Sequence, residues 1–179
     1  PDDEQMTEEE MRAVVETAHS LHKKVTAHVY AAPSIMRLAR LGVDELQHCA
    51  MIDAEALALL EELDIPVVPT FSPYEEIIHP SADNLDKMSP VFREKLLTYG
   101  PRLTAGRKLL VDSSLTLGFG SDLVSLHRSY EGAYESRAWL RSGMDPLRTL
   151  HAATAVNAKL LEIDHLTGTL APGKAADIA

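Results

Sequence analysis

Val25-Thr26-Ala27-His28-Val29-Tyr30 is a short, β-prone and apolar stretch, typical of a strand that is covered on both faces. A helical pattern follows from Pro33 to Leu41, and Gly42 is placed as its C-terminal stop. The next strand pattern, residues 43–48, is followed by a helix over residues 54–63, which Asp53 caps.

The same alternation extends in both directions from these elements. Thr7-Glu8-Glu9-Glu10 has the pattern of a capping box and predicts a helix that runs to about Leu21. Residues 65–70 predict a third strand, and Leu115-Thr116-Leu117-Gly118-Phe119-Gly120-Ser121-Asp122 predicts a fourth. Residues 72–90 are rich in Pro, Asp, Glu and Ser, which is typical of a long loop or lid. Helical patterns also cover residues 91–112, 130–141 and 146–161.

Strand and helix therefore alternate four times, which predicts parallel strands joined by right-handed crossovers. The fold class is α/β, either a doubly wound sheet or part of a (β/α)8 barrel. The chain has 179 residues, 45% of them hydrophobic and 25% charged, enough for a sizeable core.

The charge balance and the single cysteine restrict the function. Lys and Arg total 17 against 27 Asp and Glu, and the resulting net charge of -10 argues against nucleic-acid or anionic-membrane binding. Cys49 is the single cysteine, which excludes an internal disulfide and favours the cytoplasm. No apolar run approaches the roughly 20 residues that span a bilayer, and no signal peptide is visible at the start.

Three predicted strand ends carry metal-ligand side chains. His28 ends the first strand, His48 the second and Asp122 the fourth. In parallel α/β folds the carboxyl ends of the strands face the ligand. Two imidazoles and a carboxylate suit zinc, and also iron or manganese, with an open position for water. A single histidine is more often an ordinary core or surface residue. Metal-ligand side chains at three predicted strand ends, however, favour a metal site.

Other candidate motifs are weaker. His127 follows Asp122 in the next loop, where a substrate contact and a plain surface histidine are about equally plausible. There is no HExxH motif, and neither GxSxG nor a complete GxGxxG occurs around Gly118-Phe119-Gly120-Ser121-Asp122. Cys49 beside His48 has no evident activating base and is predicted to be a small core residue.

At these residues the chain resembles the amidohydrolase superfamily, in particular its imidazolonepropionase-like and prolidase-like (Xaa-Arg dipeptidase-type) branch. Residues 25–30, 42–48, 65–70 and 118–122 are similar to the fifth to eighth strands of the family's barrel. The Gly168–Ile178 segment resembles the return to a small β-sandwich. The resemblance implies the C-terminal half of a (β/α)8 TIM-type barrel over residues 1–162 and the start of the β-sandwich over residues 163–179.

The chain also departs from the family pattern. The family's His-x-His motif and its metal-bridging carboxylated lysine are absent, and both would lie before Pro1. Lys23 and Lys24 precede a strand and would lie at the opposite end of the barrel. The expectation is therefore a fragment of a longer protein. Because half a barrel has unpaired edges, the chain should need its N-terminal half or a second copy, as in a homo-oligomer.

The resemblance implies a metal-dependent hydrolase of amide bonds, acting on a dipeptide or an N-acyl amino acid. His28 and His48 would hold one divalent ion, with zinc favoured, and missing residues would hold a second. Asp122 would be both metal ligand and catalytic acid-base, while Tyr30 and His127 would bind substrate. The alternatives are a hydrolase of a cyclic amide, urea or carbamate, a non-catalytic scaffold of the same fold, and an α/β ligand-binding module.

Overall fold

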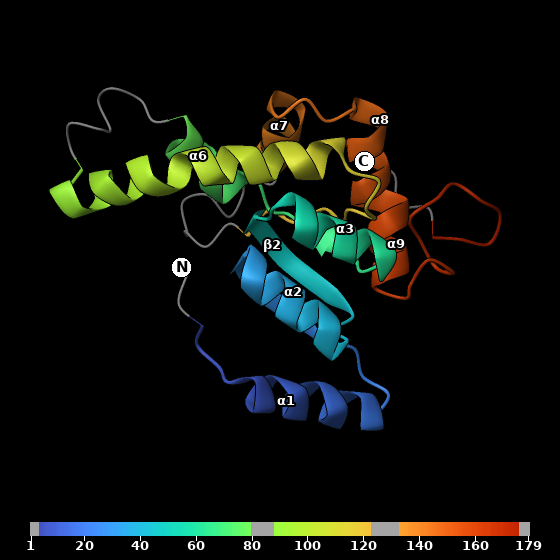
Figure 1. The fold of residues 1–179 in the computed structure, drawn as a ribbon. Helices are drawn as coiled ribbons and strands as arrows, with labels where there is room; N and C mark the ends of the chain where they lie inside the picture. Colours follow the sequence, from blue (N-terminus) through green and yellow to red (C-terminus); the bar gives the residue numbers. More distant parts are fainter. Residues whose placement is uncertain (1–3, 80–87, 123–132, 176–179) are drawn as a thin grey trace.

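The protein is described by a computed structural model, which covers residues 4–79, 88–122 and 133–175. Three parallel strands form a sheet in the order β1-β2-β3, and helices follow each strand (Figure 1). The elements in chain order are α1 (Glu8–Ser20), β1 (Thr26–Ala31), α2 (Ala32–Leu41), β2 (Glu45–Met51), α3 (Ala54–Glu62), β3 (Val67–Val68), the 3-10 helix η1 (Ser72–Tyr74), α4 (Glu75–Ile78), α6 (Pro90–Asp112), α7 (Ala133–Arg141), α8 (Pro146–His151), the π-helix η2 (Ala152–Val156) and α9 (Asn157–Leu160).

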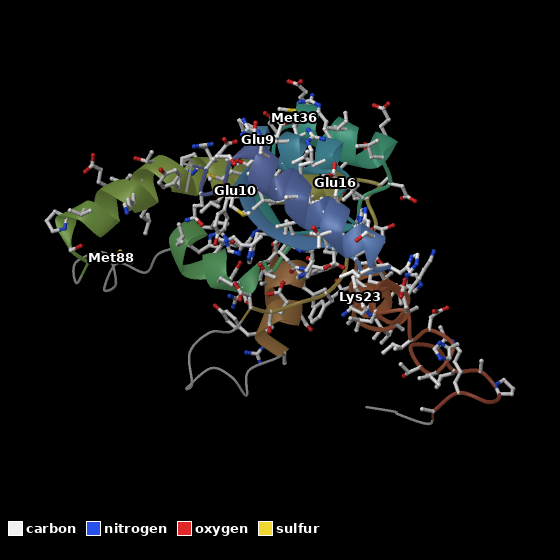
Figure 2. The ribbon with its side chains drawn as sticks, turned by 90° about the horizontal axis from the view of Figure 1, so that it is seen from below. Glu9, Glu10, Glu16, Lys23, Met36 and Met88 are labelled. Carbon is white, nitrogen blue, oxygen red and sulfur yellow. The ribbon has the colours of Figure 1, made fainter. Side chains whose placement is uncertain are left out.

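The helices cover the sheet and enclose one main hydrophobic core. Helix α2 packs on β1 and β2, α6 packs on β2, and α1 packs on α2. Figure 2 shows α1 on the outside of this layer, with Glu9, Glu10 and Glu16 among its charged side chains. Leu46, Val67 and Ile35 are fully buried in the core between strands and helices.

The register of the sheet places the strand ends at one edge. Thr26 of β1 lies opposite Glu45 of β2, and His28 lies opposite Gln47, in parallel pairing. Along β1 the buried Val29 and Ala31 alternate with the more exposed His28 and Tyr30. Since consecutive side chains of a strand point to opposite faces, His28 and Tyr30 share the face that lies away from the core.

The elements of the first half of the chain confirm the sequence predictions. Thr7 caps α1, and the capping box with Glu10 is complete. Gly42 ends α2 in the left-handed conformation, at φ 85°. Asp53 caps α3 through the backbone N–H of Ala56. Each signal is local, so neighbouring residues are enough to specify it.

The third and fourth strands are shorter than predicted. The strand expected over residues 65–70 is reduced to β3, and the one over residues 115–122 to a single parallel bridge between Val67 and Leu117. The side-chain amide of Asn157 accepts from the Phe119 N–H and donates to the Phe119 carbonyl, both at 2.8 Å. These are the bonds that a neighbouring strand would otherwise make, so the ladder ends there.

The predicted loop or lid over residues 72–90 is wrong for its first part. Residues 72–78 form η1 and α4, and Ser72, Tyr74 and Glu75 are buried. The Ser72 N–H donates to Glu135, and Glu75 pairs with Arg107. The amino-acid composition of the segment does not predict such partners in the interior. Residues 80–87 lie outside the described part of the chain.

Gly106 of α6 allows the helix to approach the end of β2. A Cβ atom at this position would lie 2.4 Å from the carbonyl oxygen of Ala50, which is backbone and cannot rotate away. We expect Gly106→Ala to lower the free energy of unfolding by about 1 to 3 kcal/mol, because the helix must shift outward. Chemical denaturation followed by circular dichroism measures the change.

Gly100 of the same helix is the matched control. A Cβ there would meet only the Ile77 carbonyl oxygen, at an ordinary 3.7 Å. Gly100→Ala should stabilise the protein slightly, by up to about 1 kcal/mol, through helix propensity. Equal effects of the two substitutions would contradict the close approach at Gly106.

Two further predictions concern the membrane and the C-terminal end. No helix in the described ranges is both long and apolar enough to cross a bilayer. After Leu160, the described residues up to Ala175 form turns and bends, and Gly168 packs against Ala158. The return to a β-sandwich over residues 163–179 stays a prediction.

Candidate active site

His28 and His48 lie side by side within β1 and β2, each three residues before the last residue of its strand, so the prediction that they end their strands is wrong. The Nδ1 atom of His28 is 2.7 Å from the Nε2 atom of His48, and the ring centroids are 4.2 Å apart. His28 is exposed, whereas His48 is only 3% exposed. The parallel register therefore brings the two predicted histidines together.

The backbone at the end of β2 directs the His48 side chain toward its neighbour. His48 and Cys49 have positive φ angles of 69° and 50°, and the pairing of β1 with β2 is irregular beyond Val29. Non-glycine residues seldom adopt this conformation, and such irregularities cluster at functional sites. Cys49 is buried and free, as predicted for a core residue, and burial raises the pKa of its thiol.

Thr70 holds the other side of the His48 ring. Its Oγ1 atom lies 2.5 Å from His48 Nδ1, and Thr70 is 2% exposed. When Nδ1–H donates to this hydroxyl, the lone pair of the ring is on Nε2, which faces His28. Thr70 is thus placed to accept from Nδ1–H in the tautomer that leaves Nε2 free to bind.

The interior keeps His48 uncharged. The pKa of His48 is lowered to about 4, first by burial and then by the charge of His28, while the negative charge of Asp122 opposes both effects. The imidazole is therefore neutral near pH 7, and the neutral form is the one that binds metal ions.

Asp122 approaches the pair from the stretch that follows the Val67–Leu117 bridge. Its Oδ2 atom is 4.0 Å from His48 Nε2, and its side chain is 42% exposed. Asp122 has φ 45°, and the carbonyl of the preceding Ser121 accepts a 2.8 Å hydrogen bond from Ser72 Oγ. Asp122 is thus close to the histidines yet partly open to solvent.

Two tyrosines surround the histidine pair. The Tyr30 ring stacks on His48 at 5.2 Å and meets His28 edge-on at 4.7 Å. The buried Tyr74 lies edge-on to both Tyr30 and His48. Burial raises the pKa of the Tyr74 phenol. The rings of Tyr30 and Tyr74 therefore pack against the histidine pair.

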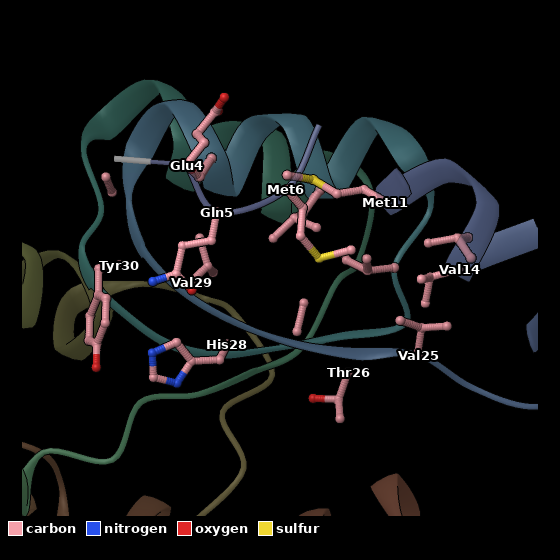
Figure 3. Close-up of a pocket in the computed structure, with 16 residues that line it drawn as sticks. Glu4, Gln5, Met6, Met11, Val14, Val25, Thr26, His28, Val29 and Tyr30 are labelled. Carbon is pink, nitrogen blue, oxygen red and sulfur yellow. The ribbon is translucent and has the colours of Figure 1, made fainter. Parts of the chain in front are cut away.

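A pocket of about 480 Å³ adjoins His28 on the outer edge of β1. All seven residues from Val25 to Ala31 contribute to its lining, which indicates that it follows the edge of the strand. Figure 3 shows His28 and Tyr30 pointing to the same side of β1 at one end of this pocket. Sheet pairing occupies the other edge of β1, where β2 lies.

The donor set of the histidine pair fits a divalent metal ion. Two nitrogens that each bind zinc at ~2.0 to 2.1 Å in tetrahedral geometry lie roughly 3.3 Å apart. The observed separation of 2.7 Å is shorter, so the exposed His28 ring would turn away from His48 to admit an ion. Within the described ranges, no three His, Cys, Asp or Glu side chains form a group that could hold an ion. The predicted set of His28, His48 and Asp122 therefore stays a prediction.

The amidohydrolase family model matches residues 1–179. The chain belongs to the amidohydrolase family. The resemblance that the sequence suggested is thereby confirmed, and the α/β fold with its parallel sheet agrees with amidohydrolase barrels.

Proteins similar to this chain include prolidases and an ochratoxinase. The ochratoxinase of Aspergillus niger is 29% identical over 185 residues, covering 99% of this chain and 36% of the relative. A Xaa-Pro dipeptidase with methionine bound in its active site superposes with a TM-score of 0.82 at 30% identity, covering 98% of this chain and 43% of the other. A prolidase complexed with N-methylphosphonate-L-proline gives 0.78 at 28% identity, covering 98% and 42%. The chain thus spans less than half the length of these relatives.

Several residues around this amidohydrolase site were not predicted. Thr70 is the last residue of the third predicted strand, and Tyr74 follows it by four residues. This position at the end of a predicted strand was the sequence signal that could have identified them as site residues. Glu135 and Arg107, which are 0% and 7% exposed, fix the segment that carries Thr70. Both occur in helical patterns where charged residues ordinarily face solvent. His127 lies outside the described residues of the amidohydrolase chain.

Proposed function

We propose that this amidohydrolase is part of a metal-dependent enzyme that hydrolyses the amide bond of a dipeptide or an N-acyl amino acid. The observation that carries the proposal is the placement of His28, His48 and Asp122. The two imidazole nitrogens, on neighbouring parallel strands, are 2.7 Å apart, and the carboxylate is 4.0 Å from one of them. Active sites of α/β barrels are assembled from residues toward the carboxyl ends of their parallel strands.

His28 and His48 are the residues that would hold the ion, through Nδ1 and Nε2. Zinc is the first candidate, because neutral imidazoles are among its preferred ligands. When bound, a divalent ion supplies Lewis-acid chemistry, polarising the scissile carbonyl and making water acidic enough to ionise near neutral pH. The lowered pKa of His48 supports this role, because no proton has to be displaced from it near pH 7.

Asp122 is proposed to move the proton of the reaction. Its carboxylate is partly exposed and beside the histidines, so it can accept a proton from the attacking water. The same group can then donate that proton to the nitrogen of the leaving amine. We also propose Asp122 as a metal ligand in the complete site.

Tyr30 is proposed to orient the substrate. Its ring is fixed between His28, His48 and Tyr74, next to the proposed reaction centre. The methionine and the prolyl phosphonate bound by the related dipeptidase and prolidase each contain an α-carboxylate. The Tyr30 hydroxyl can donate a hydrogen bond to such a carboxylate or to the scissile carbonyl. His127 is proposed as a second substrate contact.

We further propose that the chain forms the C-terminal half of a (β/α)8 barrel. In support, β1 has one neighbour within the described sheet, the pocket follows its other edge, and the chain covers 36 to 43% of the relatives named above. An N-terminal half would supply the remaining ligands and a second metal ion. A homo-oligomer in the cytoplasm is the proposed assembly and location.

The test is amide hydrolysis by the complete protein. A panel of dipeptides and N-acyl amino acids is assayed for amine release, before and after metal removal and after return of zinc. We expect hydrolysis that chelation abolishes and zinc restores. Hydrolysis that survives chelation would refute the metal role, and a metal-loaded protein inert toward the whole panel would favour the scaffold.

A further inference from the structure

Residues 70–72, here called the linking segment, connect the two parts of the candidate site. At its first residue, Thr70 Oγ1 contacts His48 Nδ1 at 2.5 Å. At its last residue, Ser72 Oγ donates to the carbonyl of Ser121, next to Asp122. A displacement of this segment would therefore move both the histidine and the aspartate elements.

The linking segment is held in an unfavourable conformation. Thr70 has φ 46°, in the left-handed region that β-branched residues rarely occupy. Such a strained residue persists only where the surroundings enforce it. The left-handed conformation directs the buried Thr70 hydroxyl at His48.

Glu135 of α7 supplies that enforcement from within the core. Its Oε1 atom accepts from the N–H of Phe71, and its Oε2 atom accepts from the N–H of Ser72, both at 2.7 Å. Trp139 Nε1–H donates to Oε1, also at 2.7 Å, and fixes the carboxylate from behind. Glu135 itself is 0% exposed. Both oxygens therefore hold successive peptide groups of the linking segment.

Arg107 of α6 holds the same segment from the other side. Its Nη2 atom donates to the Phe71 carbonyl at 2.8 Å, and its guanidinium lies over the Phe71 ring, 4.9 Å from the centroid. Arg107 also pairs with the buried Glu75. The linking segment thus has hydrogen-bond partners on both sides, because Glu135 accepts from two of its N–H groups and Arg107 donates to one of its carbonyl groups.

We propose that Glu135 is a positioning residue that sets the orientation of His48 through Phe71, Ser72 and Thr70. The inference rests on the proposed function, in which His48 binds the metal ion. A buried carboxylate adds little net stability, since desolvation offsets most of its attraction. The two Glu135 oxygens do fix the orientation of the linking segment, which carries Thr70. A metal-binding imidazole requires a hydrogen-bond partner of fixed orientation, and Thr70 is that partner for His48.

A double-mutant cycle on the complete protein tests the proposal. Thr70→Val removes the hydroxyl at nearly constant shape, Thr70→Ser retains it, and Glu135→Gln weakens the hold on the two N–H groups. The first measurement is the dissociation constant for Zn²⁺, by competition with a chromophoric chelator. The second is the ¹⁵N shifts of the His48 ring in the metal-free protein, which report the nitrogen that carries the proton.

We expect Thr70→Val to weaken zinc binding about 10- to 100-fold, the range for partners of metal ligands, with Thr70→Ser close to wild type. Glu135→Gln should weaken binding in the same direction, and adding it to Thr70→Val should produce no further loss. Both single variants should move the His48 ¹⁵N shifts the same way. Ser142→Ala is the control, because Ser142 contacts Arg107 and Ala138 but not the linking segment.

A purely structural role predicts a different outcome. Glu135→Gln would then lower the melting temperature, as Ser142→Ala also can, while zinc affinity and the His48 shifts stay unchanged. Multiplicative losses in the double variant would also overturn the proposal. If the wild-type protein binds no zinc through His28 and His48, the proposed function fails, and the His48 shifts in the metal-free variants still decide this inference.

Discussion

Asp122→Asn is expected to lower kcat about 10²- to 10⁴-fold, the range for removal of a positioned general acid-base group. The amide keeps the shape and one oxygen of the carboxylate but cannot accept and return a proton. Asp122 lies 4.0 Å from His48 Nε2 and is partly exposed, so the substitution leaves the core intact. Steady-state kinetics on the best substrate of the panel, together with metal content, measures the effect.

Asp112→Asn is the matched control for this substitution. Asp112 is an exposed carboxylate that pairs with Lys108 at the end of α6, and its loss should leave kcat unchanged. Unchanged turnover in Asp122→Asn would exclude the proposed acid-base role. Loss of turnover together with loss of metal would reassign Asp122 to metal binding alone.

Arg107→Met is expected to lower the free energy of unfolding by about 3 to 5 kcal/mol. The substitution leaves the Glu75 carboxylate, which is 4% exposed, without its buried partner. Arg141 lies 3.6 Å from Glu75 but is mostly exposed, so it compensates only in part. The Phe71 carbonyl also loses its donor. Urea denaturation of the metal-free protein measures the change.

Arg12→Met is the same substitution in an exposed ion pair. Arg12 and Glu8 lie one helical turn apart on α1, with both side chains about half exposed. Such pairs contribute roughly 0.3 to 0.5 kcal/mol, so this variant should unfold close to wild type. Similar losses for Arg12→Met and Arg107→Met would contradict the view that burial makes the Arg107–Glu75 pair important.

Sequence patterns predicted the elements whose signals are local. The capping box at Thr7, the left-handed Gly42 and the N-cap Asp53 each depend on a few neighbouring residues. The length of the last strands was not predictable in this way. The amide of Asn157 takes the place of a strand partner for Phe119, and 38 residues separate them in the chain.

The same distinction holds within the site. The proximity of His28 and His48 was predictable because their strands pair in parallel as neighbours, although each residue lies three positions before the end of its strand. Thr70 and Glu135 were not, because their roles depend on a left-handed backbone angle and on a carboxylate that is buried by tertiary contacts. A glutamate in a helical pattern is ordinarily predicted at the surface.

Metal content of the complete protein tests the central claim most directly. Elemental analysis after dialysis compares the wild type with the His28→Ala/His48→Ala double variant. A His19→Ala/His22→Ala variant serves as control, since those residues lie at the end of α1, where His19 contacts Asp44 just before β2. We predict one or two equivalents of divalent metal in the wild type and the control, and loss of at least one from the double variant. Equal metal content in all three proteins would contradict the account.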